Sequence, residues 1–278
     1  MVAAALFSEA FISMPLAADP NFSASLVQLL RKNRVSLWIP ILDEEIVHGA
    51  RLSESANRGI CRIQAPSVAV AQLCFDKLEM GRWLNKNGIP TPETSPLCSV
   101  SWRKSGWFVK PRRGRGSDGA RLLFDRATFD AVQHSSEDLI AQPVCKKPEV
   151  TIDVFISQNG RMIRALCRER IEIKAGVCTK ARVFRDDELE SLARQLGIGL
   201  NLRGAFCFQV LRDPSGKKWT VTDVNPRPGA GTAISAAVGF DTGSAMLADL
   251  TGGDFKGYIR LPRRDRFVVR TYQEHVFC

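Results

Sequence analysis

What this 278-residue sequence lacks excludes several kinds of site. Its three histidines, His48, His134 and His275, stand far apart, so nothing suggests a histidine-based catalytic system. The eight cysteines contain no C-x-x-C pair and no plausible zinc quartet, which favours a reduced, cytoplasmic protein in which cysteine serves as a small apolar residue. No apolar run approaches membrane-spanning length, and there are no internal repeats or low-complexity tracts. The apolar first twenty residues lack a basic leading region and carry Glu9, so we expect them to belong to the fold rather than to a signal peptide.

The composition is that of a folded, basic protein. With 45% hydrophobic residues, the chain can bury a substantial core, and its length predicts two or three subdomains. A net charge of +10 is compatible with nucleic-acid binding, because basic surfaces bind phosphate backbones through counterion release. The lysines and arginines are dispersed, however, and no recognisable nucleic-acid motif accompanies them. A basic cleft for anionic small molecules accounts for much of the charge.

The segment 222–227, T-D-V-N-P-R, sets a carboxylate and an amide on alternate residues at the end of an apolar run. Strand side chains alternate between two faces, so Asp223 and Asn225 point the same way. The preceding run 204–211 also alternates and carries Gln209, and the turn sequence D-P-S-G between the runs predicts a β-hairpin. An even register sum places the three side chains on one face, where they could hold Mg²⁺ with substrate phosphates, and an odd sum separates them. Taken alone, D-x-N-P indicates only a strand that ends in a turn.

A second polar cluster begins at Lys110, with the sequence K-P-R-R-G-R-G-S-D-G. A short strand that ends in lysine, followed by a loop with three glycines, offers backbone amides and a fixed positive charge to a polyphosphate. The lysine precedes the glycines, so this is not the P-loop pattern, and the strand, helix and downstream acid of a dinucleotide-binding fingerprint are missing. The alternative is a flexible basic hairpin.

Periodicity predicts an α/β protein. Helical spacing over 21–33 and 43–57 alternates with strand-like runs over 35–39 and 59–64, as in βαβ units of a parallel sheet. Further along the chain, a helix is expected to begin at Asp76-Lys77 and to end at Gly88.

Two more elements follow. A strand over 149–156 is expected to bury one face and to leave Glu149 at its rim. An amphipathic helix is expected over 186–196, with Gly197 as its cap.

The order of these elements resembles the ATP-grasp superfamily, in its carbamoyl-phosphate-synthetase-like or carboxylate-amine ligase-like branch. The resemblance starts near Pro40 and covers nearly the whole chain. The motifs that carry it are D-K at 76–77, G-I-P-T-P at 88–92, V-K-P-R-R-G-R-G-S-D-G at 109–119, E-V-T-I-D-V at 149–154, R-G-A-F-C-F-Q-V at 203–210 and D-V-N-P-R-P-G-A-G-T at 223–232. Each motif is loose, whereas their order and spacing are specific.

The resemblance implies an ATP-grasp fold, in which two α+β subdomains clasp ATP, preceded by a shortened Rossmann-like pre-ATP-grasp domain. We expect the shortened N-terminal domain over 1–73, a linker helix and the lid subdomain over 74–145, and the C-terminal subdomain with the metal site over 146–278. We expect the N-terminal domain to lack the family's opening strand, which would expose a sheet edge or recruit a second subunit, so a homo-oligomer is one expectation.

The same resemblance implies ATP and Mg²⁺, or Mn²⁺ in its place, as cofactors. The phosphates would be held by Lys77, Lys110 and the lid residues Gly114, Gly116 and Ser117. Gln142 stands where the family contacts adenine, and Glu149 matches the carboxylate that accepts hydrogen bonds from the ribose hydroxyls.

The resemblance also implies the residues nearest to the chemistry. Gln209, Asp223 and Asn225 match the metal-binding triplet, and Arg227 matches the residue that faces the transferred phosphoryl group. Arg170, which precedes the Gly176 turn, is expected to contact a substrate carboxylate through its planar fork, in preference to Arg168. An R-x-R pair on a strand is otherwise most often a solvated face.

Two positions depart from the family pattern. Glu is more frequent in the family where Asp223 stands, and the shorter side chain weakens the case for a two-metal arrangement. In the D-alanine ligase branch, an Arg precedes the first metal ligand by two residues, whereas here that residue is Cys207. The acceptor chemistry of that branch is therefore not assumed.

The sequence leads to the hypothesis of an ADP-forming ATP-grasp ligase that makes a C–N bond. It would activate a carboxylate or bicarbonate as an acyl-phosphate for attack by an amine or ammonia. Its partners would be small-molecule carboxylates and amines, and neither a membrane nor a nucleic acid. A non-catalytic ATP-binding protein is the first alternative, and a basic nucleic-acid-binding protein is the second.

Overall fold

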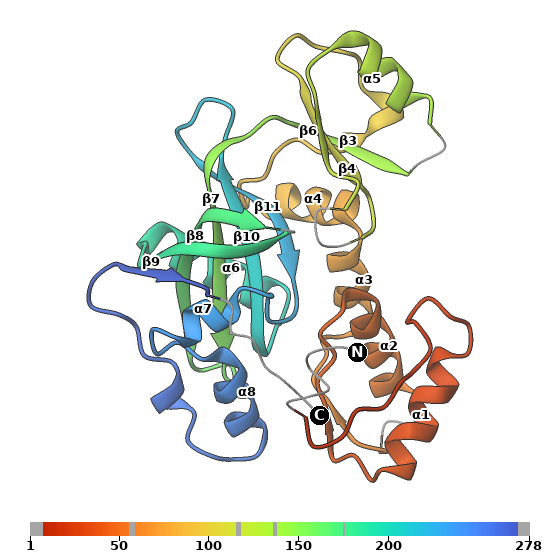
Figure 1. Ribbon diagram of the computed structural model, residues 1–278, viewed down its shortest axis with the longest axis vertical. Coiled ribbons are helices and arrows are strands. Elements are labelled where there is room, and N and C mark those ends of the chain that lie inside the picture. Colours follow the sequence, from red (N-terminus) through yellow and green to blue (C-terminus); the bar gives the residue numbers. More distant parts are fainter. Residues whose placement is uncertain (1–7, 56–58, 115–117, 136–137, 175, 272–278) are drawn as a thin grey trace. The chain divides into compact units, whose positions relative to one another are not determined.

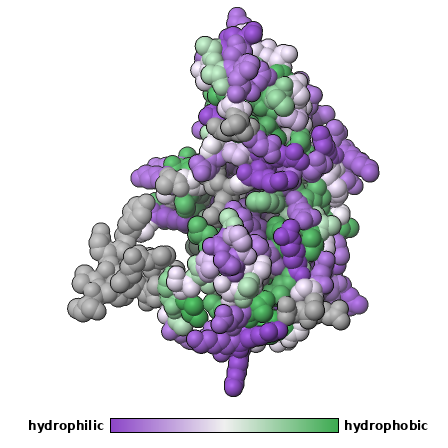
Figure 2. Space-filling model, turned by 90° about the vertical axis from the view of Figure 1, so that its right-hand side faces the viewer, coloured by the Kyte–Doolittle hydropathy of each residue, from purple (hydrophilic) through white to green (hydrophobic). Residues whose placement is uncertain are grey.

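A computed structural model of the chain describes residues 8–55, 59–114, 118–135, 138–174 and 176–271 (Figure 1). The chain divides into two compact units, residues 1–68 and residues 69–278. None of the helices in the described ranges is long and apolar enough to cross a membrane. On the face of the molecule drawn in Figure 2, hydrophilic and hydrophobic residues are interspersed.

The first unit alternates helices and short strands. Its elements are α1 (Phe22–Lys32), β1 (Leu37–Trp38), α2 (Asp43–Glu54) and β2 (Arg62–Ile63). β1 and β2 pair in parallel, as the alternation predicted. Each strand is only two residues long and half-buried or exposed, so the strands expected over 35–39 and 59–64 were too long. The reason is that within the described residues the two strands pair only with each other.

The second unit begins with the helices α3 (Val68–Phe75) and α4 (Lys77–Lys86). The carboxylate of Asp76 caps α4 by accepting hydrogen bonds from the backbone N–H groups of Leu78 and Glu79, both at 3.2 Å. The chain leaves this helix at Gly88, whose positive φ of 67° favours glycine, as the sequence predicted.

A small antiparallel sheet follows, in the strand order β3-β6-β4-β5. Its elements are β3 (Ser95–Pro96), the short helix η2 (Leu97–Ser99), β4 (Trp107–Pro111), β5 (Arg121–Leu123), α5 (Arg126–Gln133) and β6 (Leu139–Pro143). Phe129 of α5 packs on one face of this sheet with Trp107, Val109 and Leu123. This layer forms a compact subdomain, with Lys110 near the end of β4.

The larger sheet has six strands in the order β11-β10-β7-β8-β9-β12, and every neighbouring pair is antiparallel. Its strands are β7 (Lys146–Ile156), β8 (Ile163–Lys174), β9 (Val177–Phe184), β10 (Gly204–Arg212), β11 (Trp219–Asn225) and β12 (Arg266–Val269). The helices that accompany it are α6 (Asp187–Gly199), α7 (Thr232–Ala236), α8 (Thr242–Leu250) and the short η3 (Lys256–Tyr258).

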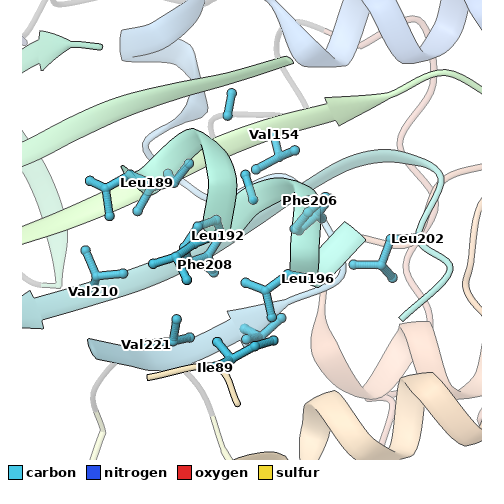
Figure 3. Packing of buried hydrophobic residues seen from close by; sticks show 14 of the residues in the cluster. Ile89, Val154, Leu189, Leu192, Leu196, Leu202, Phe206, Phe208, Val210 and Val221 are labelled. Atoms are coloured by element: carbon cyan, nitrogen blue, oxygen red, sulfur yellow. The ribbon is translucent and has the colours of Figure 1, made fainter. Parts of the chain in front are cut away.

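Helix α6 covers one face of the large sheet and forms the main core. Figure 3 shows Leu189, Leu192 and Leu196 of α6 lying against Phe206 and Phe208 of β10. Each leucine contributes roughly 1.5–3 kcal/mol when it is fully buried. This packing holds β10 and its neighbour β11 in fixed positions.

The opposite face of the sheet is covered as well. Val150, Ile152 and Val154 of β7 belong to the α6 core, as predicted. α8 packs against β7 and β10, and the alternate residue Phe155 is also fully buried. β7 is therefore buried on both faces, whereas the sequence was interpreted as a strand with one buried face.

The end of α6 differs from the prediction. The helix runs through Gly197 to Gly199, so Gly197 is not its cap. Gly197 lies on the buried side, where a Cβ would come within 2.3 Å of Ile156 Cδ1. A side chain at this position would have to displace the terminal methyl of Ile156, which is buried in the core.

We therefore expect Gly197→Ala to lower the free energy of unfolding by about 1–3 kcal/mol, because overpacking exceeds the helix-propensity gain of roughly 1 kcal/mol. Urea unfolding followed by circular dichroism measures the change. Ser191→Ala, on the exposed side of the same helix, is the control and should leave stability unchanged or slightly raised. Equal stability of Gly197→Ala and the parent chain would contradict the close approach.

Candidate functional site

The β10–β11 hairpin decides where its polar side chains point. Nearest the turn, Val210 pairs with Val221, so the residue numbers of a pair add up to an odd number there. If this register continued, Gln209 would lie opposite Thr222. A β-bulge follows, and beyond it Gln209 pairs with Asp223. The extra residue is Thr222, whose hydroxyl donates to the carbonyl of Gln209 at 3.2 Å. The bulge therefore converts an odd register into an even one.

The bulge satisfies two demands at once. Val221 and Val224, three residues apart, both lie in the apolar core, which a regular strand does not allow. Gln209 and Asp223 are direct cross-strand neighbours on the other face, and Asn225 follows Asp223 by two residues. Asn225 Nδ2 donates to Asp223 Oδ2 at 3.3 Å, so these side chains converge. The predicted triplet shares one face of the hairpin.

A cleft of about 640 Å³ lies between the small sheet and the large sheet. Eight of the residues singled out from the sequence line it, namely Lys77, Lys110, Gly114, Gln142, Glu149, Arg170, Gln209 and Asp223. Asn225 and Arg227 are not part of this lining and lie beyond Asp223, at and after the end of β11. Gly116 and Ser117 fall outside the described residues.

Lys110 is the most enclosed cation of the cleft. It projects from β4, is only 9% exposed, and its Nζ donates to the backbone carbonyl of Thr222 at 2.9 Å. Burial lowers the pKa of Lys110, Asp223 opposes this effect, and Lys77 adds to the lowering. The bulge residue thus accepts a hydrogen bond from the lysine of the opposite sheet.

Lys77 stands at the first position of α4, and its Nζ donates to the carbonyl of Gly114. The start of this helix is tied to the same loop by Asp76, which accepts from Arg112 at 2.8 Å and from Arg113 at 3.1 Å. Burial raises the pKa of Asp76, but the hydrogen bond from Arg112 and the backbone N–H groups outweigh burial and hold the pKa below its usual value. Asp76 is therefore an anchor for the lysine-bearing helix.

Gln142 closes another wall of the cleft. It is 4% exposed on β6, and its Nε2 donates to Thr94 Oγ1 at 2.8 Å. The residues that follow it, Pro143, Val144 and Cys145, also line the cleft.

Glu149 and Arg170 form an ion pair inside the cleft. The register places Val150 opposite Glu169, which makes Glu149 and Arg170 cross-strand neighbours. Arg170 also donates through Nη2 to the carbonyl of Gly176 at 3.0 Å. The sequence assigned these two residues to different ligands and did not predict their pairing, because the register of β7 against β8 was unknown.

Arg168, by contrast, is enclosed by protein. It is 2% exposed and donates to Asp153, with Nε at 3.2 Å from Oδ2. The same carboxylate accepts from Thr232 Oγ1 at 3.2 Å and from Ser235 Oγ at 2.6 Å, both of α7. Burial tends to lower the pKa of Arg168, but Asp153 outweighs it and raises the pKa. This network ties the segment after β11 to the middle of the sheet.

The sequence analysis did not single out Asp153, Thr222, Thr232 or Ser235. Asp153 stands in an apolar run, E-V-T-I-D-V, and a carboxylate there was a usable signal, since buried charges are normally paired. Thr222 gave no signal, because a threonine before a carboxylate is ordinary strand sequence.

A family model of the ATP-grasp domain matches residues 74–231, which is more than half of the chain. The chain belongs to the ATP-grasp family. The predicted family and the ATP-grasp fold are thereby confirmed, and the predicted Rossmann-like N-terminal domain is supported in part, by the parallel pair of β1 and β2. No curated protein matches the sequence of this ATP-grasp chain.

Solved structures share this ATP-grasp fold at low sequence identity. N5-carboxyaminoimidazole synthetase from Staphylococcus aureus, complexed with ADP, has a TM-score of 0.72 and 18% identity over 94% of this chain and 69% of its own. L-amino acid ligase from Bacillus licheniformis has a TM-score of 0.67 and 17% identity over 93% and 68%. Pyruvate carboxylase from Rhizobium etli has a TM-score of 0.70 and 13% identity over 89% of this chain but only 24% of its own length.

The buried ion pair of this ATP-grasp protein leads to a stability prediction. We expect Arg168→Met to lower the free energy of unfolding by about 3–5 kcal/mol, because Asp153 is left buried without its counter-charge. Chemical unfolding measures the loss. Arg126→Met, which removes a solvent-exposed pair with Asp130 on α5, is the control and should change stability little. Indistinguishable unfolding midpoints for the two variants would refute the assigned importance of the pair.

Proposed function

We propose that this protein is an ATP-dependent ligase that activates a carboxylate or bicarbonate as an acyl-phosphate for attack by an amine or ammonia. The observation that carries the proposal is a single cleft in which Lys77 and Lys110 face a hairpin that presents Gln209 and Asp223. Positive charge on one wall and oxygen ligands on the other suit a polyphosphate with a bound divalent cation.

Each wall of the cleft has a part in nucleotide binding. Lys77, Lys110 and the loop that begins at Gly114 would bind the phosphates. Gln142 and the backbone after it would contact the adenine. Glu149, which is ion-paired with Arg170, would accept hydrogen bonds from the ribose hydroxyls. Arg170 would therefore help to bind the nucleotide, and it would also contact the substrate carboxylate, since it lines the same cleft.

The residues of the hairpin fit a divalent cation. Their donor set consists of one carboxylate and two amide oxygens, which hard cations such as Mg²⁺ and Mn²⁺ accept alongside phosphate oxygens. Gln209, Asp223 and Asn225 would provide this set. When bound, the cation would neutralise charge on the transferred phosphoryl group.

The reaction would proceed in two balanced steps. A carboxylate oxygen of the substrate bonds to the γ-phosphorus while the bond to the ADP oxygen breaks. The amine nitrogen then bonds to the acyl carbon, the bond from that carbon to the phosphate oxygen breaks, and the amine proton passes to solvent. Lys110 would offset the charge on the phosphoryl oxygens, and Arg227, after β11, would face the group in transfer.

The names of similar structures support this reaction class. One is a synthetase with bound ADP and another is an L-amino acid ligase. We assign residues 1–73 to an N-terminal domain, 74–145 to the linker helix and lid, and 146–278 to the subdomain with the metal site. The protein would act in the cytoplasm on small molecules, as a monomer or as a homo-oligomer.

The proposal is tested by screening carboxylates with amines for coupled release of ADP. With a productive pair, we expect Lys110→Ala and Asn225→Ala to lower the rate at least about a hundredfold, since each removes part of the transition-state stabilisation. Lys218→Ala, exposed in the hairpin turn, is the matched control and should retain full activity. Undiminished ADP release in either site variant would refute the assigned roles. ATP binding without ADP release from any pair would favour a non-catalytic ATP-binding protein.

The lowered pKa of Lys110 predicts proton uptake when the nucleotide binds. Burial is the main cause of the lowering, and phosphate charge beside Nζ would raise the pKa again. At a pH between the lowered pKa of Lys110 in the free protein and its raised pKa in the complex, the complex holds more protons than the free protein. The affinity for ATP should therefore fall as the pH rises through this range. Calorimetry in buffers of different ionisation enthalpy measures the uptake. Lys110→Met should abolish it, and pH-independent binding by the parent chain would contradict the prediction.

A further inference from the structure

The loop between β11 and α7, residues 226–231, carries Arg227. It has the sequence P-R-P-G-A-G, and its residues do not belong to the described lining of the cleft. The backbone N–H of Arg227 donates to the carbonyl of Asn225 at 2.8 Å, and that of Thr232 donates to the carbonyl of Gly229 at 3.0 Å. These bonds shape the loop locally, so its position relative to the sheet depends on contacts with other elements.

Two glycines bring one side of the loop into contact with the sheet. A Cβ at Gly229 would lie 3.1 Å from Cys207 Sγ, and a Cβ at Gly231 would lie 2.2 Å from Arg168 Nη1. Arg168 cannot move aside easily, because it is buried and ion-paired with Asp153. The loop backbone therefore rests directly on the guanidinium group of Arg168.

A second arginine holds the loop at its exposed residue, Ala230. Arg270 directly follows β12, and its Nη2 donates to the carbonyl of Ala230 at 2.9 Å. The backbone of Arg270 is fixed in turn, since its N–H donates to the carbonyl of Thr179 of β9 at 2.8 Å. The last strand of the large sheet is thereby connected to the loop that carries Arg227.

The two arginines act on the loop in different ways. Arg168 limits how closely the backbone approaches the sheet, whereas Arg270 opposes movement away from it with a hydrogen bond from a charged donor, which is stronger than one between neutral groups. The guanidinium of Arg227 donates to the carbonyl of Pro228 at 3.2 Å, so its orientation depends on the loop backbone. A shift of the loop would therefore also displace Arg227.

We propose that Arg270 is a positioning residue, which holds the loop 226–231 against Arg168 and thereby directs Arg227 toward the group in transfer. This inference rests on the proposed function, in which Arg227 faces that group. It gives a role in the reaction to β12, at the edge of the large sheet. Because neither Arg270 nor the loop belongs to the described lining of the cleft, loss of Arg270 should leave ATP binding intact.

Hydrogen exchange followed by mass spectrometry tests the anchor without any substrate. In Arg270→Met, we expect the amides over 226–234 to exchange about fivefold faster than in the parent chain, because a hydrogen bond that holds the loop is lost. Peptides of β10 should exchange at the parent rate. Arg266→Met removes an exposed arginine of β12 and is the matched control, in which both segments should be unchanged. Unchanged exchange over 226–234 in Arg270→Met, or equally accelerated exchange in β10, would overturn the inference.

Steady-state kinetics with a carboxylate and amine pair that supports ADP release tests the role in the reaction. We expect Arg270→Met to lower kcat about tenfold, since a displaced Arg227 is misaligned with the transition state, and to leave the KM for ATP unchanged. Arg266→Met should retain the parent kcat. A raised KM for the carboxylate at unchanged kcat would mean that Arg270 contacts the substrate itself and would overturn the positioning role. Arg270→Ala serves if Arg270→Met does not fold.

The outcomes for the inference and for the proposed function are distinct. If the parent chain and Arg270→Met release ADP at the same rate, the inference fails and the proposed function stands. If calorimetry detects no ATP binding to the parent chain and no pair gives ADP, the proposed function fails and the positioning role fails with it.

Discussion

The single extra residue Thr222 is the constraint on which the whole site depends. The β10–β11 hairpin must place apolar side chains against α6 and polar side chains in the cleft. If the pairing near the turn continued unchanged, Asp223 would lie on the α6 face. The bulge shifts the register by one residue. The carbonyl of Thr222, the extra residue, accepts a hydrogen bond from Lys110. The bulge that orients Asp223 therefore also holds the lysine of the small sheet. Core packing and site geometry are thus two results of one backbone irregularity.

That coupling explains why the cleft can be strongly charged and still be ordered. Lys110 is nearly buried, and an unpartnered ammonium there would cost several kcal/mol, but a carbonyl and a carboxylate lie beside it. Lys77 is likewise held by the carbonyl of Gly114. In the proposed nucleotide site, phosphate oxygens would replace these polar partners of the two lysines, so binding would need little reorganisation of the protein. On the same face of the sheet as Asp223, Asp153 holds α7, which follows Arg227 in the chain.

Sequence reasoning predicted the features that depend on local pattern and motif order. The hairpin, the helix at Asp76, the strand of Glu149 and the family all follow from spacing and residue type. Features that depend on register could not be predicted, because no local pattern announces them. The odd turn register at Val210 would have ended the argument for a shared face, and only the bulge restores it. The pairing of Glu149 with Arg170 has the same origin.

Gly197 illustrates a different limit of sequence reasoning. Near the end of an amphipathic stretch, a glycine is most often a cap, and that interpretation used only the helix itself. In the structure its role is set by Ile156, which lies on another element. The same reasoning applies to Asn225. Its residue type suggests a metal ligand, but its hydrogen bonds to Asp223 and Arg227 depend on the fold of the strand end and could not be predicted. A side chain's chemistry defines what it can bind, and its hydrogen-bond partners decide which of those options remain open.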